Sequence, residues 1–318
     1  MKNKIIIIFV LLLLMMPFSV DAYKKDPNYQ KARHSGAITR IIISATDDNG
    51  EPVSDVQINV LMGMNFRVNA YCIKGQTDKQ GMFAVEGITT GNEIEIEALK
   101  DGYYKAYKKL CFAEMGNEYE VKDDKWQPWG MEISLPLRKR CNPIPLIWIY
   151  DGKDIPTTNQ WFSFDMQKKD WVMPGHTGVT ADFEVYLTWD GKPLPRTKQS
   201  DLIVRFIGEG AGYYFSDKTL DSKFKGVYHA NTNATFKKEL ICKSFRGENG
   251  GLIRTGIPDN KFIVVRTRCK LDEKKNIIEA NYSALVKIFA QGGWHGTANA
   301  FMYYLFNPTP NDTNLEAK

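Results

Sequence analysis

The sequence predicts an all-β protein built from two antiparallel β-sandwich domains, and two observations support this prediction. Apolar and polar residues alternate over short stretches along most of the chain, as in Val56–Val60, Glu93–Ala98 and Phe183–Trp189. Such a period of two is typical of strands that bury one face. Turn-forming residues separate the stretches, and no helical stripe of apolar residues interrupts them. Short strands with regular turns favour antiparallel sandwiches.

The N-terminus has the pattern of a secretory signal peptide, residues 1–22. Two lysines precede the apolar run Ile5–Met16, and small residues before Tyr23 suit cleavage after Ala22. As a helix, the run would span about 18 Å, which is short of the roughly 30 Å hydrocarbon core. We therefore expect cleavage and export to the periplasm or the cell surface, and no stable membrane span in the mature chain.

Beyond the signal peptide, changes in pattern predict four further segments. Residues 23–37 are polar and without periodicity, which indicates a flexible leader. Alternating patterns then predict one sandwich over 38–139 and a second over 140–307. The prolines of Asn307-Pro308-Thr309-Pro310 cannot continue a ladder of strands, so residues 308–318 are expected to form a C-terminal tail.

The stretch Gly75–Ile88 predicts a hairpin. Asp78 is placed to accept hydrogen bonds from backbone amides two residues further on, and Gly81 offers the positive φ that closes a turn. Phe83 and Val85 then point to one face of a strand, and Met82, Ala84 and Glu86 to the other. A calcium-binding loop would need further carboxylates at alternating positions, so the turn is interpreted as part of the fold.

Two motifs in this region also carry a resemblance to a family. They are Asp-x-x-Gly-x-Pro-Val-x-x-Val-x-Ile-x-Val at 47–60 and Thr-Asp-x-x-Gly-x-Phe-x-Val-x-Gly-Ile at 77–88, followed by Gly91 and Gly102-Tyr103. Residues 38–137 thereby resemble the carboxypeptidase regulatory-like domain, with Met131–Leu137 as the closing strand. The resemblance implies a seven-stranded, transthyretin-like or Ig-like sandwich that serves as an accessory module and has no catalytic residues. In layout, the chain resembles exported bacterial proteins with a second β-domain after this one.

The charge of the mature chain argues against a nucleic-acid partner. Without the signal peptide, 40 Lys and Arg face 36 Asp and Glu, a net charge of +4. The basic clusters, such as Arg138-Lys139-Arg140, are short and scattered, whereas a nucleic-acid groove needs positive charge concentrated along one face.

No catalytic residue, metal site or cofactor is predicted. The sequence has no G-x-S-x-G elbow, H-E-x-x-H helix or phosphate-binding loop, and its four histidines are far apart. Carboxylates are plentiful but unpatterned, so an acid pair of the glycosidase type is neither selected nor excluded. We expect a non-catalytic binding or accessory protein. The alternative is a secreted glycosidase or metal-dependent hydrolase with its site in the second domain.

Tryptophan is confined to the later part of the chain, because all seven follow residue 125. Exposed tryptophans stack on sugar rings, but the set as a whole is expected to fill the core. The exception is the glycine-flanked loop Gly292–Gly296, which is predicted to display Trp294 with His295 beside it. An unknown polysaccharide or surface protein is the expected partner. Trp294 folded back over the sandwich is the alternative.

The five cysteines leave at least one thiol without an intrachain partner. Export permits disulfides, and a Cys72–Cys111 bond is expected within the first sandwich. Cys242 with Cys269 is the competing pair.

Overall fold

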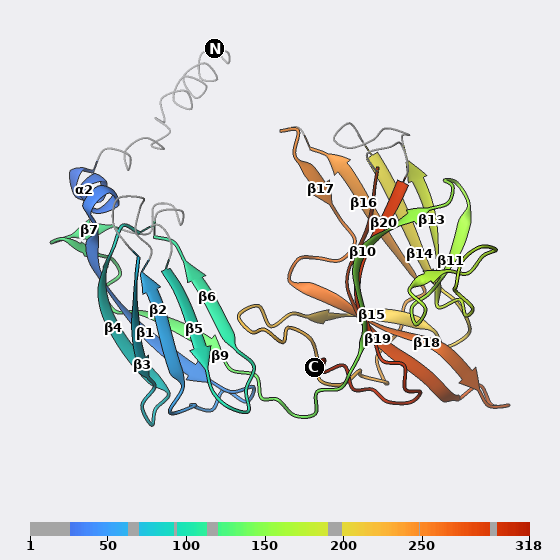
Figure 1. Cartoon of the computed structure of the whole chain (residues 1–318), viewed down its shortest axis with the longest axis horizontal. Helices are drawn as coiled ribbons and strands as arrows, with labels where there is room; N and C mark the ends of the chain where they lie inside the picture. The colour runs from blue at the N-terminus through green and yellow to red at the C-terminus, as the bar shows by residue number, and fades with distance from the viewer. Residues whose placement is uncertain are drawn as a thin grey trace, which may run out of the picture. The chain divides into compact units, whose positions relative to one another are not determined.

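The computed structural model describes residues 26–62, 70–91, 94–112, 120–189, 199–247, 249–292 and 298–318. The chain forms two compact units (Figure 1). One extends to Lys139 and includes Asp221–Lys223, and the other comprises Arg140–Leu220 and Phe224–Lys318. Among the described residues, every regular element of the two units except one helix is a strand, so the all-β prediction is confirmed.

The first unit is a sandwich of two sheets, ordered β4-β1-β8-β7, with β9 also on β1, and β3-β2-β5-β6. Two of its strands have only two residues, and the other seven form the expected seven-stranded arrangement in the described part of the chain. The strands are β1 (Ala37–Thr46), β2 (Gln57–Met62), β3 (Tyr71–Gln76), β4 (Met82–Thr89), β5 (Ile94–Leu99), β6 (Ala106–Leu110), β7 (Val121–Lys122), β8 (Lys125–Trp126) and β9 (Met131–Pro136).

The alternating patterns place the core between these sheets. In β1, every second residue from Ala37 to Ala45 is buried, including the polar Thr39. β9 is an exception to antiparallel pairing, because it runs parallel to β1 from Ile41↔Met131 to Thr46↔Pro136.

The predicted strands around Gly75–Ile88 are present, but the prediction of a hairpin was wrong. β3 pairs with β2 and β4 pairs with β1, so the turn between them crosses from one sheet to the other. The turn itself is as expected: Asp78 Oδ1 accepts the backbone N–H groups of Gln80 and Met82 at 2.9 and 2.8 Å, and Gly81 has φ +73°. Alternation reveals a strand and its buried face, but it does not reveal the partner strand.

The expected flexible leader contains a helix, α2 (Pro27–Ser35), so this prediction was wrong for residues 27–35. Asp26 caps its N-terminus by accepting the Asn28 N–H at 2.9 Å, and Pro27 occupies the first turn, where its missing N–H costs nothing. Ala32 packs into the core of the first unit, and this contact holds the short helix in place.

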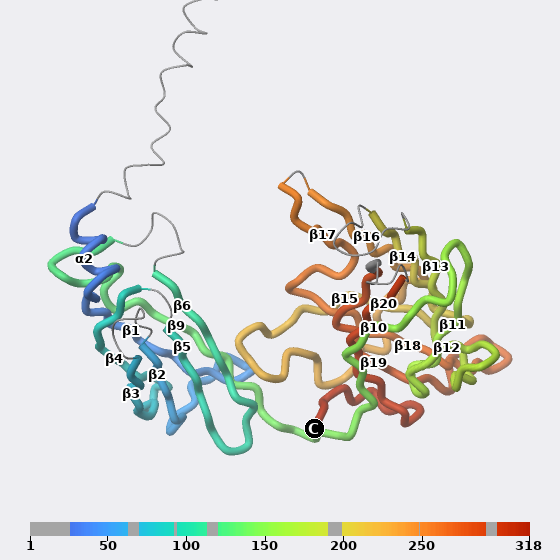
Figure 2. The backbone as a smooth tube through the Cα atoms, turned by 45° about the horizontal axis from the view of Figure 1, so that its top comes forward, coloured from blue at the N-terminus to red at the C-terminus, as the bar shows by residue number. Residues whose placement is uncertain are grey.

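The second unit also pairs two sheets (Figure 2). One has the order β10-β20-β19-β18-β15 and the other β12-β11-β13-β14-β16-β17. The strands are β10 (Ile147–Ile155), β11 (Trp161–Asp165), β12 (Asp170–Trp171), β13 (Phe183–Trp189), β14 (Gln199–Phe206), β15 (Gly212–Asp217), β16 (Glu239–Arg246), β17 (Leu252–Arg254), β18 (Lys261–Leu271), β19 (Ile277–Gly292) and β20 (Ala298–Phe306). The core between them is rich in aromatic side chains and includes Phe164, Trp171, Phe183, Phe206, Tyr304 and Phe306.

β18 and β19 form a long hairpin with its turn at 272–276, and β20 is the last strand of the unit. The predicted C-terminal tail was wrong. Leu315 is buried, and the Glu316 carboxylate accepts the backbone N–H groups of Cys141 and Asn142 at 2.9 and 2.6 Å. The last strand ends at Phe306, before the prolines, but the chain beyond them packs against the same unit.

Candidate functional site

The most exposed aromatic side chains in the described part of the chain lie together on β10. Its sequence alternates Ile147, Trp148, Ile149 and Tyr150, and Ile149 enters the core. Trp148 and Tyr150 therefore point to the opposite, outer side of the sheet, where they are 62% and 63% exposed. Residues two apart on a strand are about 6.7 Å apart, so the two rings follow each other along the edge of the sheet.

The neighbouring strands extend this surface with three more rings. Phe301 and Tyr303 of β20 meet Tyr150 edge to face, with ring centres at 5.1 and 5.3 Å. Phe289 of β19 stacks on Phe301 at 5.0 Å and 17°. β10 (green) and β20 (red) run side by side in Figure 1. We call Trp148, Tyr150, Phe289, Phe301 and Tyr303 the aromatic face.

The aromatic face is preorganised, and it is open at Trp148 and Tyr150. Contacts with Phe301 and Tyr303 hold the Tyr150 ring, so a ligand would find it already ordered. Cations cover other exposed tryptophans: Lys125 lies over Trp129 at 4.8 Å and Arg205 over Trp161 at 4.1 Å. None of the described cationic side chains covers Trp148 in this way.

Glycine at position 152 leaves one side of the face clear. Gly152 follows Tyr150 on the same side of β10 and pairs with Phe301. A Cβ there would meet nothing closer than Asn299, at 3.9 Å, and the backbone is outside the left-handed region. A side chain would fit at this position, but it would project beside Phe301. The arrangement offers flat apolar surfaces with a phenol and an indole N–H at their rims, which suits a sugar ring or another planar group.

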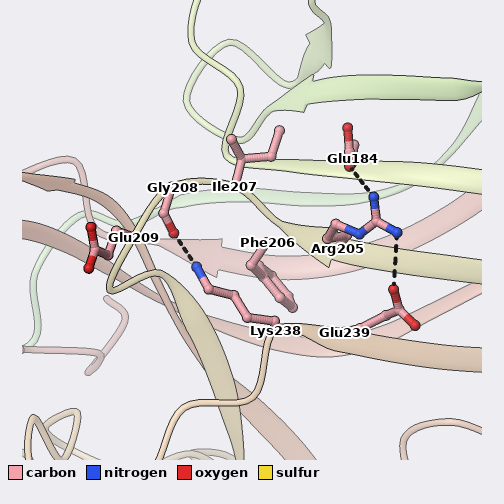
Figure 3. Close-up of a pocket in the computed structure, with 8 residues that line it drawn as sticks. All are labelled: Glu184, Arg205, Phe206, Ile207, Gly208, Glu209, Lys238 and Glu239. Carbon is pink, nitrogen blue, oxygen red and sulfur yellow. Dashed lines mark hydrogen bonds and ion pairs between the residues drawn. The ribbon is translucent and has the colours of Figure 1, made fainter.

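A separate shallow pocket of about 570 Å³ lies at one end of the other sheet (Figure 3). Glu184, Arg205 and Glu239 form a row across β13, β14 and β16, and the Arg205 guanidinium donates to both carboxylates at 3.1 and 3.3 Å. Lys238 donates to the Gly208 carbonyl.

The fifth charged residue of the pocket, Glu209, pairs with Lys275 at 3.1 Å. All five charged side chains that line the pocket are thus bonded to another protein group: four belong to ion pairs, and Lys238 donates to a backbone carbonyl.

A buried ionic cluster lies beside this pocket, because the backbone carbonyl of Asp182 accepts the N–H of the pocket residue Ile207 at 3.3 Å. Arg268 donates its Nε–H and an Nη2–H to Asp182 at 2.9 and 2.8 Å, and also donates to Asp165 at 2.7 Å. Burial alone would raise the pKa of Asp165. The backbone N–H groups of Thr180, Lys168 and Val179, together with the Arg268 charge, instead hold it below its ordinary value. These bonds tie the 165–182 segment to β18, which is a structural role.

The predicted site residues had three outcomes. Trp294 and His295 lie outside the described residues. The predicted Cys72–Cys111 disulfide was wrong, because both thiols are free and stand at opposite edges of the β3-β2-β5-β6 sheet. Three strand spacings amount to about 14 Å, far beyond the 7 Å that a disulfide spans. The competing pair is not formed either, since Cys242 and Cys269 are both free.

The expectation that tryptophans fill the core holds for only some of them. Trp126 and Trp171 are buried, and Trp126 donates its Nε1–H to the Thr89 carbonyl at 2.9 Å. Trp148 was missed as a candidate, although its alternation with two isoleucines is visible in the sequence.

The described part of the chain contains no group of three or more His, Cys, Asp or Glu side chains that could hold a metal ion. It also contains no helix with the length and apolar character needed to cross a bilayer.

Comparisons with known proteins leave the function to be argued from the structure. No protein-family model and no curated protein matches the chain. Among solved structures, chlorocatechol 1,2-dioxygenase from Pseudomonas putida is 15% identical over 33% of this chain and 61% of that one, with a TM-score of 0.27. 3-Chlorocatechol 1,2-dioxygenase from Rhodococcus opacus 1CP is 16% identical over 34% and 62%, with a TM-score of 0.26. The shaft pilin SpaA from Lactobacillus rhamnosus GG is 8% identical over 88% and 95%, with a TM-score of 0.24.

The match spans about three fifths of the length of each dioxygenase. All these scores are too low to assign a shared fold or activity. The resemblance of residues 38–137 to carboxypeptidase regulatory-like domains stays a prediction.

Proposed function

We propose that this chain is an exported, non-catalytic binding protein whose aromatic face binds a polysaccharide. The observation that carries the proposal is the pair Trp148 and Tyr150, more than 60% exposed and in line along β10. Aromatic side chains of this size are usually buried, so two exposed rings backed by three half-buried ones indicate an interaction surface.

The geometry favours a sugar over a deeply bound small molecule. The rings lie on the outer side of a sheet rather than in an enclosed cavity. Trp148 and Tyr150 are alternate residues of β10, so their rings form a line along the strand. An extended ligand with repeated flat faces matches such a surface, and the Tyr hydroxyls and the indole N–H supply hydrogen bonds at the ring edges. The signal-peptide pattern at residues 1–22 supports the proposal, because export would bring the protein to a compartment where polysaccharides occur.

The test is affinity electrophoresis and pull-down of the mature chain with a panel of polysaccharides. We expect Trp148→Ala to weaken binding about thirtyfold, because a ligand covering roughly 80–100 Å² of that ring gains about 2 kcal/mol. Tyr150→Ala should act in the same direction. Trp161→Ala is the matched control, since it removes a partly exposed tryptophan from the other sheet of the same unit.

Three results would contradict the proposal. Unchanged binding by Trp148→Ala and Tyr150→Ala would place the sugar elsewhere. In the second result, the mature chain binds no glycan but retains a cell-surface protein that neither variant retains. That result would assign the aromatic face to a protein partner. New reducing ends in the bound polysaccharide would show that the protein is a hydrolase, and Glu184 and Glu239 would then be the first carboxylates to substitute.

A further inference from the structure

The aromatic face ends in a lysine. Tyr150 pairs with Tyr303, and Tyr303 with Lys287, so these three residues form one row across β10, β20 and β19. Lys287 is exposed and lies two residues before Phe289. Within the described residues, no ion pair neutralises its ammonium group. A ligand stacked on the rings would therefore lie beside a positive charge.

Two more lysines lie on the segment that follows β15, which the backbone N–H of Lys218 joins to the start of β18 through the Asn260 carbonyl at 2.8 Å. Lys218 follows β15 and donates its Nζ–H to the backbone carbonyl of Asp259 at 2.9 Å. Burial lowers the pKa of Lys218, and the charge of Lys287 lowers it further. The Asp259 carboxylate raises the pKa of Lys218, and the charge of Lys225 lowers it. The backbone of Thr219 donates to the Lys225 carbonyl at 3.1 Å, which keeps that segment adjacent. We call Lys218, Lys225 and Lys287 the lysine cluster.

Positive charge also borders the other side of the aromatic face. The Arg254 guanidinium lies over the Phe289 ring at 4.0 Å. Of the acidic residues nearby, Asp217 already pairs with Lys261 at 2.7 Å, and Asp154 lies towards the far end of β10. Within the described residues, none of the three lysines forms an ion pair, although the Asp259 carboxylate lies close enough to Lys218 to raise its pKa.

Like charges held together favour a bound anion, because it removes their mutual repulsion and gains charge-assisted hydrogen bonds. We propose that the polysaccharide bound by the aromatic face is anionic, with sugar rings on Trp148 and Tyr150 and carboxylate or sulfate groups at the lysine cluster. This inference rests on the proposed function and adds the chemical class of its ligand.

Gly152 allows a direct test of ligand charge. Position 152 has space for a side chain and projects onto the aromatic face. Gly152→Glu and Gly152→Lys add groups of similar length and opposite charge at the same place. For an anionic ligand, we expect Gly152→Glu to weaken binding at least tenfold and Gly152→Lys to bind as well as the wild type or better. For a neutral ligand, the two variants should change the affinity by the same factor.

The probes are pairs of polymers that share a backbone: polygalacturonate with its fully methyl-esterified form, and dextran sulfate with dextran. The protein should bind a charged polymer and not its neutral counterpart. Comparison of the two pairs then shows whether the protein recognises carboxylate or sulfate groups. Lys287→Ala should lower affinity two- to fivefold and reduce its dependence on salt, as expected for one exposed ion pair. Lys243→Ala is the matched control, because Lys243 is an exposed lysine on the other sheet.

The outcomes separate this inference from the proposed function. Binding to neutral members alone, still dependent on Trp148, would overturn the inference and leave the function in place. Binding to anionic members that depends on Lys287 but not on Trp148 or Tyr150 would indicate simple electrostatic adsorption and overturn both.

Discussion

Replacing Arg268 by methionine should destabilise the second unit by about 3 kcal/mol. The change removes a guanidinium that donates four hydrogen bonds: two to Asp182, one to Asp165 and one to Gln167 at 2.5 Å. The Asp182 and Asp165 side chains are only 0% and 3% exposed, so both carboxylates would be left without their cation. Losing one partner of a buried pair costs about 3–5 kcal/mol. Since Arg268 is itself 17% exposed, the lower end applies.

Arg205→Met is the matched control, because Arg205 also bridges two carboxylates but is 46% exposed. Exposed ion pairs contribute about 0–1 kcal/mol. The assay is equilibrium unfolding in urea, with hydrogen exchange at the backbone N–H groups of Val179 and Thr180, which donate to Asp165 at 3.0 and 2.9 Å. If Arg268→Met cost no more than Arg205→Met and left exchange at these two amides unchanged, the reasoning would be refuted.

The effect should also depend on pH, with a sign that the Asp165 pKa sets. Because folding lowers this pKa below its ordinary value of 3.8, the wild type has the full contribution of Asp165 above about pH 3.8. That contribution is lost as the pH falls through the lower, folded-state pKa. In Arg268→Met, protonation removes buried negative charge, so the stability gap between the two proteins should narrow in acid.

Two further predictions concern the turn and the thiols. Gly81→Ala should destabilise the first unit by roughly 2 kcal/mol in urea unfolding, because φ is +73° and a Cβ would lie 2.6 Å from the Ala45 carbonyl oxygen; an unchanged midpoint would show that the turn adjusts. Burial raises the pKa of the Cys242 thiol to about 12, so this thiol should react with iodoacetamide only after unfolding, whereas the exposed Cys72 should react in the folded protein. Protection of Cys72 that reducing agent reverses would restore the disulfide hypothesis.

Alternation in the sequence was enough to locate strands, but not to assign their partners. Around Gly75–Ile88 the strands, the turn and the buried Val85 all follow from local pattern. Whether β3 and β4 pair with each other depends on contacts with β2 and β1, which are distant in the sequence. The same limit explains the error over Cys72 and Cys111: the order of strands in a sheet decides their separation.

The aromatic face was missed for a related reason. Along Ile147–Tyr150, both sides of the strand are apolar, so the pattern does not show which side is buried. Burial of Ile149 and exposure of Trp148 are decided by how β10 joins β20. Phe289 and Phe301 are likewise brought together by register, since they lie on different strands.

The joined ends of the second unit have a mechanical consequence. Ile144 and Ala317 form a parallel bridge, and Ile144 also bonds to the backbone of Glu316 and Lys318 at 2.9 and 3.1 Å. A pull applied between Arg140 and Lys318 would draw these two parallel segments in opposite directions along their length, loading their bonds in shear and together. The force would pass from one end of the unit to the other through this pair of segments, which we call the terminal clamp: Ile144 with Glu316, Ala317 and Lys318. While the terminal clamp holds, the strands that carry the aromatic face bear little of the load.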